Sequence, residues 1–199
     1  MYRKPSKTPS ASQFLMMAIS VENIRLRMRR PYTAERAMER IEALRRSFPA
    51  AMLTADVIVG FPGETEEDFC ELCQFVKDAK FERFGAFTYS REEDTPAYDF
   101  EDQIDEQIKQ DRADIIMREQ LEINTANNEK MLNKTITVLC EDYDPVARVH
   151  FGRSAADAPE IDGKVYFRAE KRIAPGSFVK VKVREVLDYD LMGRAITQN

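Results

Sequence analysis

The chain has few of the side chains that build disulfide frameworks or metal sites. Its 199 residues include three cysteines, Cys70, Cys73 and Cys140, and a single histidine, His150. An odd and sparse set of cysteines does not suggest disulfides, so a reducing, cytoplasmic setting is expected. Cys70 and Cys73 have the spacing of half a zinc site or of a redox pair. Without a second pair or a further histidine, the sequence favours core cysteines over a metal or redox role, with Cys73 pointing to the core and Cys70 on the flank of the same helix face.

Long apolar runs and an excess of positive charge are also absent. The apolar patch 14–19 is too short for a signal-peptide core, and no run reaches the roughly 18 residues of a membrane helix. A soluble protein without a membrane partner is therefore expected. The formal net charge of -5 argues against an unspecific polyanion binder. The arginine-rich segment 21–30 is interpreted as a solvated face, with a contact to phosphate or to an acidic partner as the alternative.

A strand, a tight loop and a helix start are predicted between residues 54 and 69. The β-branched run 57–59 stops at the sequence Gly-Phe-Pro-Gly of residues 60–63. Thr65 and Asp68 then fit a capping-box-like pattern, in which Thr65 accepts an amide hydrogen at the helix start and the acidic residue supports the positive end of the helix dipole.

The composition of this loop suits a ligand as well as a plain turn. Gly60 and Gly63 lack a Cβ, so backbone polar groups can approach a ligand there. The carboxylate of Glu64 suits an ammonium or hydroxyl group better than a phosphate. The glycine spacing excludes a Walker A loop and a dinucleotide fingerprint. An ordinary strand-to-helix turn remains the alternative.

Helices and strands alternate over residues 32–90. Thr33 is the candidate N-cap of a helix that ends before Pro49, a second helix is predicted over 66–79, and a strand over 81–90. This alternation is typical of βα units around a parallel sheet. A long helix ends near residue 128, and its expected inward-facing residues are Ile104, Ile108, Ile115, Ile116 and Ile123.

Short β-type runs replace this pattern after residue 130. They cover 135–140, 147–152, 164–168, 178–186 and 194–197, with turn signals at 144–145, 162–163, 175–176 and 189–193. Such runs predict a small antiparallel barrel that begins near Asn133. Residues 132–199 carry 11 Lys and Arg against 10 Asp and Glu. A basic face that binds RNA, an acidic tip at 157–162 that meets a basic partner protein, and a solvated loop all remain open.

Four segments resemble a known family. Residues 56–69 and 87–97 are similar to the later half of the radical-SAM barrel of the methylthiotransferases. Residues 152–166, with the run Asp-Ala-Pro-Glu-Ile-Asp-Gly, resemble the C-terminal TRAM barrel of the RimO-type branch, which acts on an aspartate of a small-subunit ribosomal protein. Residues 28–41 are also similar, and the match runs from about residue 20 to the C-terminus.

The resemblance implies an α/β partial radical SAM barrel followed by a small all-β TRAM barrel. The implied domains are an unmatched and disordered segment 1–19, a partial barrel with its closing helix over 20–131, and a TRAM domain over 132–199. Full-length members use S-adenosylmethionine and 4Fe-4S clusters. The implied cofactor contacts are Gly60, Phe61, Pro62, Gly63, Glu64, Tyr89 and Ser90. The implied contacts to the ribosomal protein, or to RNA, are Arg153, Asp157, Glu160 and Asp162.

The chain departs from the family in its cluster ligands. The family carries a Cys-x3-Cys-x2-Cys motif whose thiolates hold the SAM-cleaving cluster, and this motif is absent here. Ala18-Ile19 stand where the family has Gln-His. No cluster, and no catalytic or metal-binding residue, is therefore expected in this chain. It is interpreted as a truncated form that does not cleave S-adenosylmethionine alone; a tRNA-modifying relative and a non-catalytic binding module are the alternatives.

Overall fold

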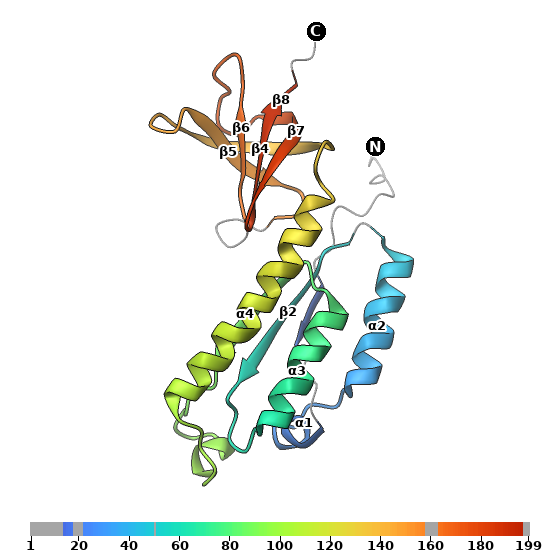
Figure 1. Cartoon of the computed structure of the whole chain (residues 1–199), viewed down its shortest axis with the longest axis vertical. Coiled ribbons are helices and arrows are strands. Elements are labelled where there is room, and N and C mark those ends of the chain that lie inside the picture. Colours follow the sequence, from blue (N-terminus) through green and yellow to red (C-terminus); the bar gives the residue numbers. More distant parts are fainter. Residues whose placement is uncertain (1–13, 18–21, 50, 158–162, 197–199) are drawn as a thin grey trace, which may run out of the picture. The chain divides into compact units, whose positions relative to one another are not determined.

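The computed structural model describes residues 14–17, 22–49, 51–157 and 163–196. The chain divides into two compact units, one of which is Phe14–Asn127, and the other includes Asn128–Asn199 (Figure 1). Most of the N-terminal segment 1–19, predicted to be disordered, lies outside the described residues, but its part Phe14–Met17 forms a β-strand.

The first unit contains a parallel sheet with the strand order β1-β2-β3. Its strands are β1 (Phe14–Met17), β2 (Leu53–Val59) and β3 (Arg83–Thr88), and both neighbouring pairs are parallel. The helices are α1 (Glu22–Arg27), α2 (Ala34–Ser47), α3 (Glu66–Ala79) and α4 (Glu106–Glu129), with a short 3-10 helix η1 (Pro96–Asp99). The βα units predicted from the alternation are confirmed.

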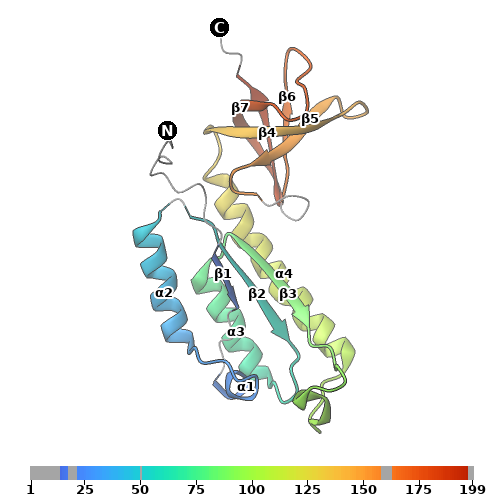
Figure 2. The same ribbon diagram turned by 180° about the vertical axis from the view of Figure 1, so that it is seen from behind.

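The two faces of this sheet differ because successive residues of a strand point to opposite sides. Ala55, Val57 and Val59 of β2 are buried in a core that includes side chains of α2, α3 and α4. The opposite face carries Asp56 and Ile58, paired in register with Gly85 and Phe87 of β3. Figure 2 shows the strands from this second side. Phe87 is 59% exposed there, so this face is much less covered than the first.

Both predicted helix caps are present. The Thr65 hydroxyl accepts from the Asp68 amide, and the Asp68 carboxylate accepts from the Thr65 amide at 2.9 Å, which completes the capping box at the start of α3. Thr33 accepts from the Arg36 amide at the start of α2. These caps fix where both helices begin, because they satisfy amides that have no partner inside the helix.

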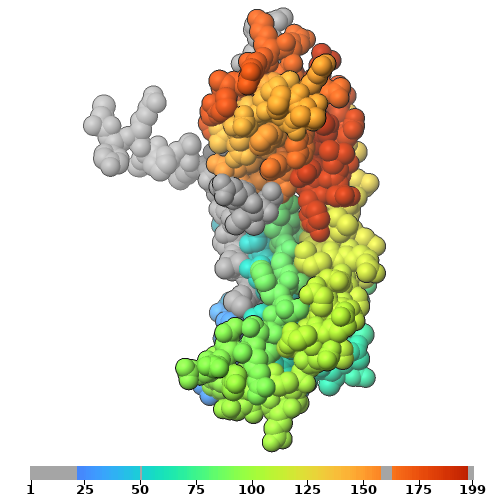
Figure 3. All heavy atoms as spheres, turned by 90° about the vertical axis from the view of Figure 1, so that its left-hand side faces the viewer, coloured from blue at the N-terminus to red at the C-terminus, as the bar shows by residue number. Residues whose placement is uncertain are grey.

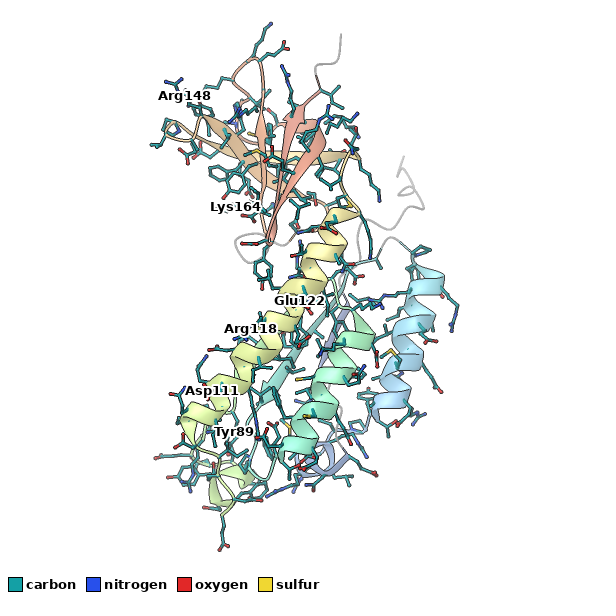
Figure 4. The ribbon with its side chains drawn as sticks, in the orientation of Figure 1. Tyr89, Asp111, Arg118, Glu122, Arg148 and Lys164 are labelled. Carbon is teal, nitrogen blue, oxygen red and sulfur yellow. The ribbon has the colours of Figure 1, made fainter. Side chains whose placement is uncertain are left out.

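Helix α4 buries a different stripe from the one predicted. Ile116 is fully buried, but Ile108 and Ile115 are 44% and 42% exposed. The buried stripe instead includes Lys109, Arg112, Ala113, Gln120 and Asn124. Figure 4 labels three residues of the exposed side, Asp111, Arg118 and Glu122. The prediction was wrong for two isoleucines because polar groups of neighbouring loops provide partners for long polar side chains at the inward positions.

The second unit contains a closed barrel with the strand order β4-β5-β6-β8-β7. The strands are β4 (Thr135–Asp144), β5 (Val149–Ser154), β6 (Val165–Arg168), β7 (Phe178–Leu187) and β8 (Asp190–Ala195). The small barrel is as predicted, but β6 and β8 pair in parallel. A closed ring with an odd number of strands cannot alternate direction throughout, so at least one neighbouring pair must be parallel. The expectation of a purely antiparallel barrel was wrong for this reason.

Glycines of the barrel mark close approaches of the backbone. Gly193 was predicted to end a turn over 189–193, yet it lies inside β8, and the chain turns near Asp188, which has a φ of 46°. A Cβ at Gly193 would lie 2.5 Å from the Lys182 carbonyl oxygen. The glycine is therefore required by packing and not by the turn.

Candidate cofactor cavity

A cavity of about 520 Å³ lies at the carboxyl ends of β2 and β3. Its lining residues are Met28, Asp56, Ile58, Phe61, Phe87, Thr88, Tyr89, Ser90, Glu92, Thr95 and Ala97. Apolar and aromatic side chains form much of the wall, and two carboxylates and four hydroxyl groups supply its polarity. None of these lining residues is a lysine or arginine. The cavity therefore suits a flat, partly apolar ligand that carries hydroxyl groups and positive charge.

Tyr89 is the clearest sign that the cavity takes a polar ligand. Its side chain is 8% exposed, and its hydroxyl has no hydrogen-bond partner among the described residues. The ring packs edge-on against Phe61, with centroids 5.1 Å apart, and Phe61 makes a similar contact with Phe100. Because an unpaired buried hydroxyl is costly, a ligand that bonds to it recovers this free energy.

Both glycines of the loop after β2 have a positive φ, 71° at Gly60 and 84° at Gly63. A Cβ at Gly60 would lie 2.3 Å from Cγ of Lys109, and one at Gly63 would clash with the guanidinium of Arg27. The absence of side chains is thus required by packing inside the protein as well as by the backbone conformation.

Glu64 is bound within the protein. Its carboxylate, 8% exposed, accepts from the Gly60 amide at 2.9 Å and from Nη1 of Arg112 at 2.8 Å. Burial raises the pKa of Glu64, while the Gly60 amide and Arg112 act in the opposite direction. Arg112 also binds Glu66, so it ties the loop to the first turn of α3. Glu64 therefore stabilises the conformation of the loop through contacts within the protein.

The seven predicted cofactor contacts fall into two groups. Phe61, Tyr89 and Ser90 line the cavity together, and Ser90 donates from its hydroxyl to Glu92 at 2.5 Å. The loop positions Gly60, Pro62, Gly63 and Glu64 adjoin the cavity without being among its lining residues. Figure 3 shows part of the segment that follows Ser90, in green, at the surface of the first unit.

Sequence reasoning missed several lining residues, of which Asp56 has the clearest signal. It is the only charged residue of β2, and it lies on the face opposite the buried core positions. A carboxylate inside a β-branched strand indicates that the face it occupies is polar or functional. Met28, which precedes the α/β units in sequence, carried no comparable signal.

Two arginines of the segment 21–30, Arg25 and Arg27, make contacts within the protein. Arg25 is 8% exposed and donates to the Arg30 carbonyl, so the interpretation as a solvated face was wrong for this residue. Arg27 makes a two-pronged contact with Asp102 at 2.7 and 2.9 Å and stacks over Phe100. The hydrogen bond from Arg27 lowers the pKa of Asp102. Arg27 therefore holds segment 100–102 against the loop.

The described cysteines do not fit an iron–sulfur cluster, whose ligands must be thiolates. Cys73 packs against the core, and burial raises the pKa of its thiol to about 11. Cys140 is fully buried inside the barrel, and Cys70 is exposed. Within the described ranges, no three His, Cys, Asp or Glu side chains are grouped to hold a metal ion.

The predicted partner contacts in the barrel are only partly described. Arg153 forms an ion pair with Glu141 at 3.2 Å. The Asp157 carboxylate accepts from both the amide and the hydroxyl of Ser154, so it stabilises its own turn. Glu160 and Asp162 lie outside the described residues.

A row of cations crosses the outer surface of the barrel. Arg168 on β6 is in register with Arg194 on β8, which is in register with Lys182 on β7. A hollow of about 500 Å³ beside this row is lined by Arg168, Ala169, Glu170, Arg184, Glu185, Met192, Gly193 and Arg194. Two glutamates in the hollow offset part of its positive charge, so its electrostatic potential is mixed.

None of the described helices combines the length and hydropathy of a membrane span. Two family models match the chain. One, described as the Radical SAM superfamily, covers residues 13–76, and the other, described as the TRAM domain, covers residues 134–196. The chain thus combines part of a radical SAM domain with a TRAM barrel, which confirms the predicted fold class. Full-length proteins of the superfamily use S-adenosylmethionine and 4Fe-4S clusters.

Relatives named ribosomal protein uS12 methylthiotransferase RimO place the chain in the RimO-type methylthiotransferase family. The protein from Desulforamulus reducens is 44% identical over 180 residues, which are 90% of this chain and 40% of the relative. That from Clostridioides difficile is 44% identical over 171 residues, 86% of this chain and 38% of the relative. One from Vibrio cholerae is 43% identical over 169 residues, which are 85% of this chain and 36% of the relative. The chain therefore spans about two fifths of the length of these relatives.

Proposed function

We propose that this chain supplies one wall of an S-adenosylmethionine site and the partner-binding barrel of a methylthiotransferase that acts on an aspartate of ribosomal protein uS12. The observation that carries the cofactor assignment is the cavity at the ends of β2 and β3, with its unpaired Tyr89 hydroxyl. The names of the relatives support the substrate.

The cavity has the chemistry that S-adenosylmethionine requires. Asp56 and Glu92 offer negative charge to a sulfonium or ammonium group, and Ile58 and Phe61 offer apolar contact to an adenine ring. The Tyr89 hydroxyl can bond to the ribose or to the base. When bound, the cofactor supplies the radical chemistry of its superfamily. Because no cluster ligands are grouped in the described part of the chain, we infer that the chain alone does not cleave the cofactor.

Replacing Asp56 by asparagine is expected to weaken binding of S-adenosylmethionine about tenfold and that of S-adenosylhomocysteine less than about twofold. The two ligands differ at the charged sulfur, so only the first loses an attraction to the carboxylate. Equilibrium dialysis with each ligand measures the effect. Asp78→Asn, a change on the exposed side of α3, is the matched control and should alter neither affinity. Equal losses for both ligands would contradict a carboxylate–sulfonium contact.

The barrel partner is tested by comparing uS12 with tRNA. We expect uS12 to bind more tightly, and the double variant Lys182→Ala/Arg194→Ala to retain most of this binding. The cation row favours the second candidate, a tRNA-modifying relative. In that case tRNA binding would be tight, would fall steeply with salt concentration, and would be lost in the double variant. Titrations at low and at physiological salt distinguish the two functions.

A further inference from the structure

Helix α4 holds both ends of strand β3 through side chains. Nε2 of Gln120 donates to the carbonyl of Phe81, which precedes β3, at 2.9 Å. Nζ of Lys109 donates to the carbonyl of Tyr89, which follows β3, at 3.1 Å. Lys109 is 1% exposed, so its ammonium group is enclosed at the back of the cavity wall. Figure 4 labels Tyr89 near the first turns of α4.

Lys109 occupies a position that the strand ladder leaves open. The Tyr89 amide donates to the Val59 carbonyl at 2.9 Å. In a regular parallel ladder, the Tyr89 carbonyl would next accept from the amide two residues beyond Val59. However, β2 ends at Val59, and the chain turns away at Gly60 with its positive φ. The lysine ammonium is the donor that the Tyr89 carbonyl meets instead.

The methylene stem of Lys109 also fits the loop. Its Cγ lies where a Cβ of Gly60 would come within 2.3 Å, so the turn after β2 packs directly on the stem. The ammonium lies 5.2 Å from the centroid of the Tyr89 ring and binds Glu106 at 2.6 Å. One buried side chain thus contacts the segments that carry two walls of the cavity, Phe61 and Tyr89.

We propose that Lys109 is a positioning residue for the cavity, acting through the Tyr89 carbonyl and the turn at Gly60. In a trans peptide the carbonyl and the following amide point in opposite directions, so the bond to Lys109 also orients the Ser90 amide away from α4. The identity of the ligand rests on the function proposed above, whereas the proposal that Lys109 positions the loop does not.

The test compares Lys109→Met, which keeps a stem of similar length but removes the donor, with Lys77→Met. The control removes a partly exposed lysine of α3 that pairs with Glu119 of α4. Amide hydrogen exchange of the whole chain, without ligand, is measured first. Residues 60–64 and 89–91 should exchange about tenfold faster in Lys109→Met, the size expected for loss of a hydrogen bond to a charged group. Exchange in the barrel, and at these residues in Lys77→Met, should be unchanged.

Dialysis against S-adenosylmethionine is the second measurement. Lys109→Met should bind about tenfold more weakly, and Glu106→Gln, which leaves the Tyr89 contact in place, should bind like the unmodified chain. Unchanged exchange at 60–64 and 89–91, or faster exchange with unchanged affinity, would overturn the proposal. Faster exchange in a chain that never binds S-adenosylmethionine would overturn the cofactor assignment instead. If Lys109→Met does not fold, Lys109→Leu, which also lacks the donor, replaces it, and unaltered exchange at these residues in that variant would overturn the proposal equally.

Discussion

Replacing Arg112 by methionine should lower the free energy of unfolding of the first unit by about 3–5 kcal/mol, because the Glu64 carboxylate would stay buried without its partner. Arg112 and Glu64 are 5% and 8% exposed, and their charged atoms lie 2.8 Å apart. Chemical denaturation followed by far-UV circular dichroism measures the change. Arg46→Met is the control, since its ion pair with Glu42 is exposed and should contribute less than about 0.5 kcal/mol.

The loss in Arg112→Met should depend on pH with a defined sign. Burial already raises the pKa of Glu64, and removal of the guanidinium takes away a group that lowers it. A carboxyl whose pKa is raised in the folded state stabilises the fold most below its ordinary value of 4.5, and this contribution is lost as the pH rises through the raised pKa. The variant should therefore lose least near pH 4.5 and most at neutral pH. A loss that does not vary with pH would mean that Glu64 is not the unpaired charge.

Replacing Gly152 by alanine should destabilise the barrel by about 3 kcal/mol or more, since the new methyl group has no space. Its Cβ would lie 1.9 Å from the carbonyl oxygen of Leu139 on the neighbouring strand β4. A backbone carbonyl inside a ladder cannot rotate away as a side chain can, so β4 and β5 must separate. Differential scanning calorimetry should show a lower unfolding temperature for the barrel.

Gly176→Ala separates the effect of space from that of backbone conformation. Gly176 has a φ of 84°, but a Cβ there would meet nothing within 4 Å. The substitution should cost only about 1–2 kcal/mol, the strain of a left-handed conformation for a residue with a side chain. If Gly176→Ala were the more damaging of the two variants, the argument from crowding at Gly152 would be wrong.

Local features of the fold could be predicted from the sequence, whereas the burial of polar side chains on α4 could not. The capping box of Thr65 and Asp68 involves residues three positions apart, so the pattern alone defines it. The inward positions of Lys109 and Arg112 depend on a carbonyl and a carboxylate that lie 20 and 48 residues away. Hydrophobic periodicity contains no information on such partners, and it therefore assigned isoleucines to the buried stripe.

The candidate site shows the same division. Phe61, Tyr89 and Ser90 were predicted from a resemblance of short segments, and they do line one cavity. Asp56 and Met28 join them only because strands β2 and β3 pair in parallel and the segment after α1 returns to their ends. The role of the loop glycines could be predicted only in part, since a sequence shows that a side chain is missing but not which neighbour fills the space.

The buried Tyr89 hydroxyl makes the cavity observable by optical spectroscopy. The sequence contains no tryptophan and seven tyrosines, so phenol rings dominate its near-ultraviolet absorption and emission. A hydroxyl without a partner absorbs at a different wavelength from one that donates a hydrogen bond, and the enclosed ring of Tyr89 has a fixed orientation against Phe61. The protein therefore carries its own chromophore at the proposed cofactor wall, and occupancy of the site can be followed without a label.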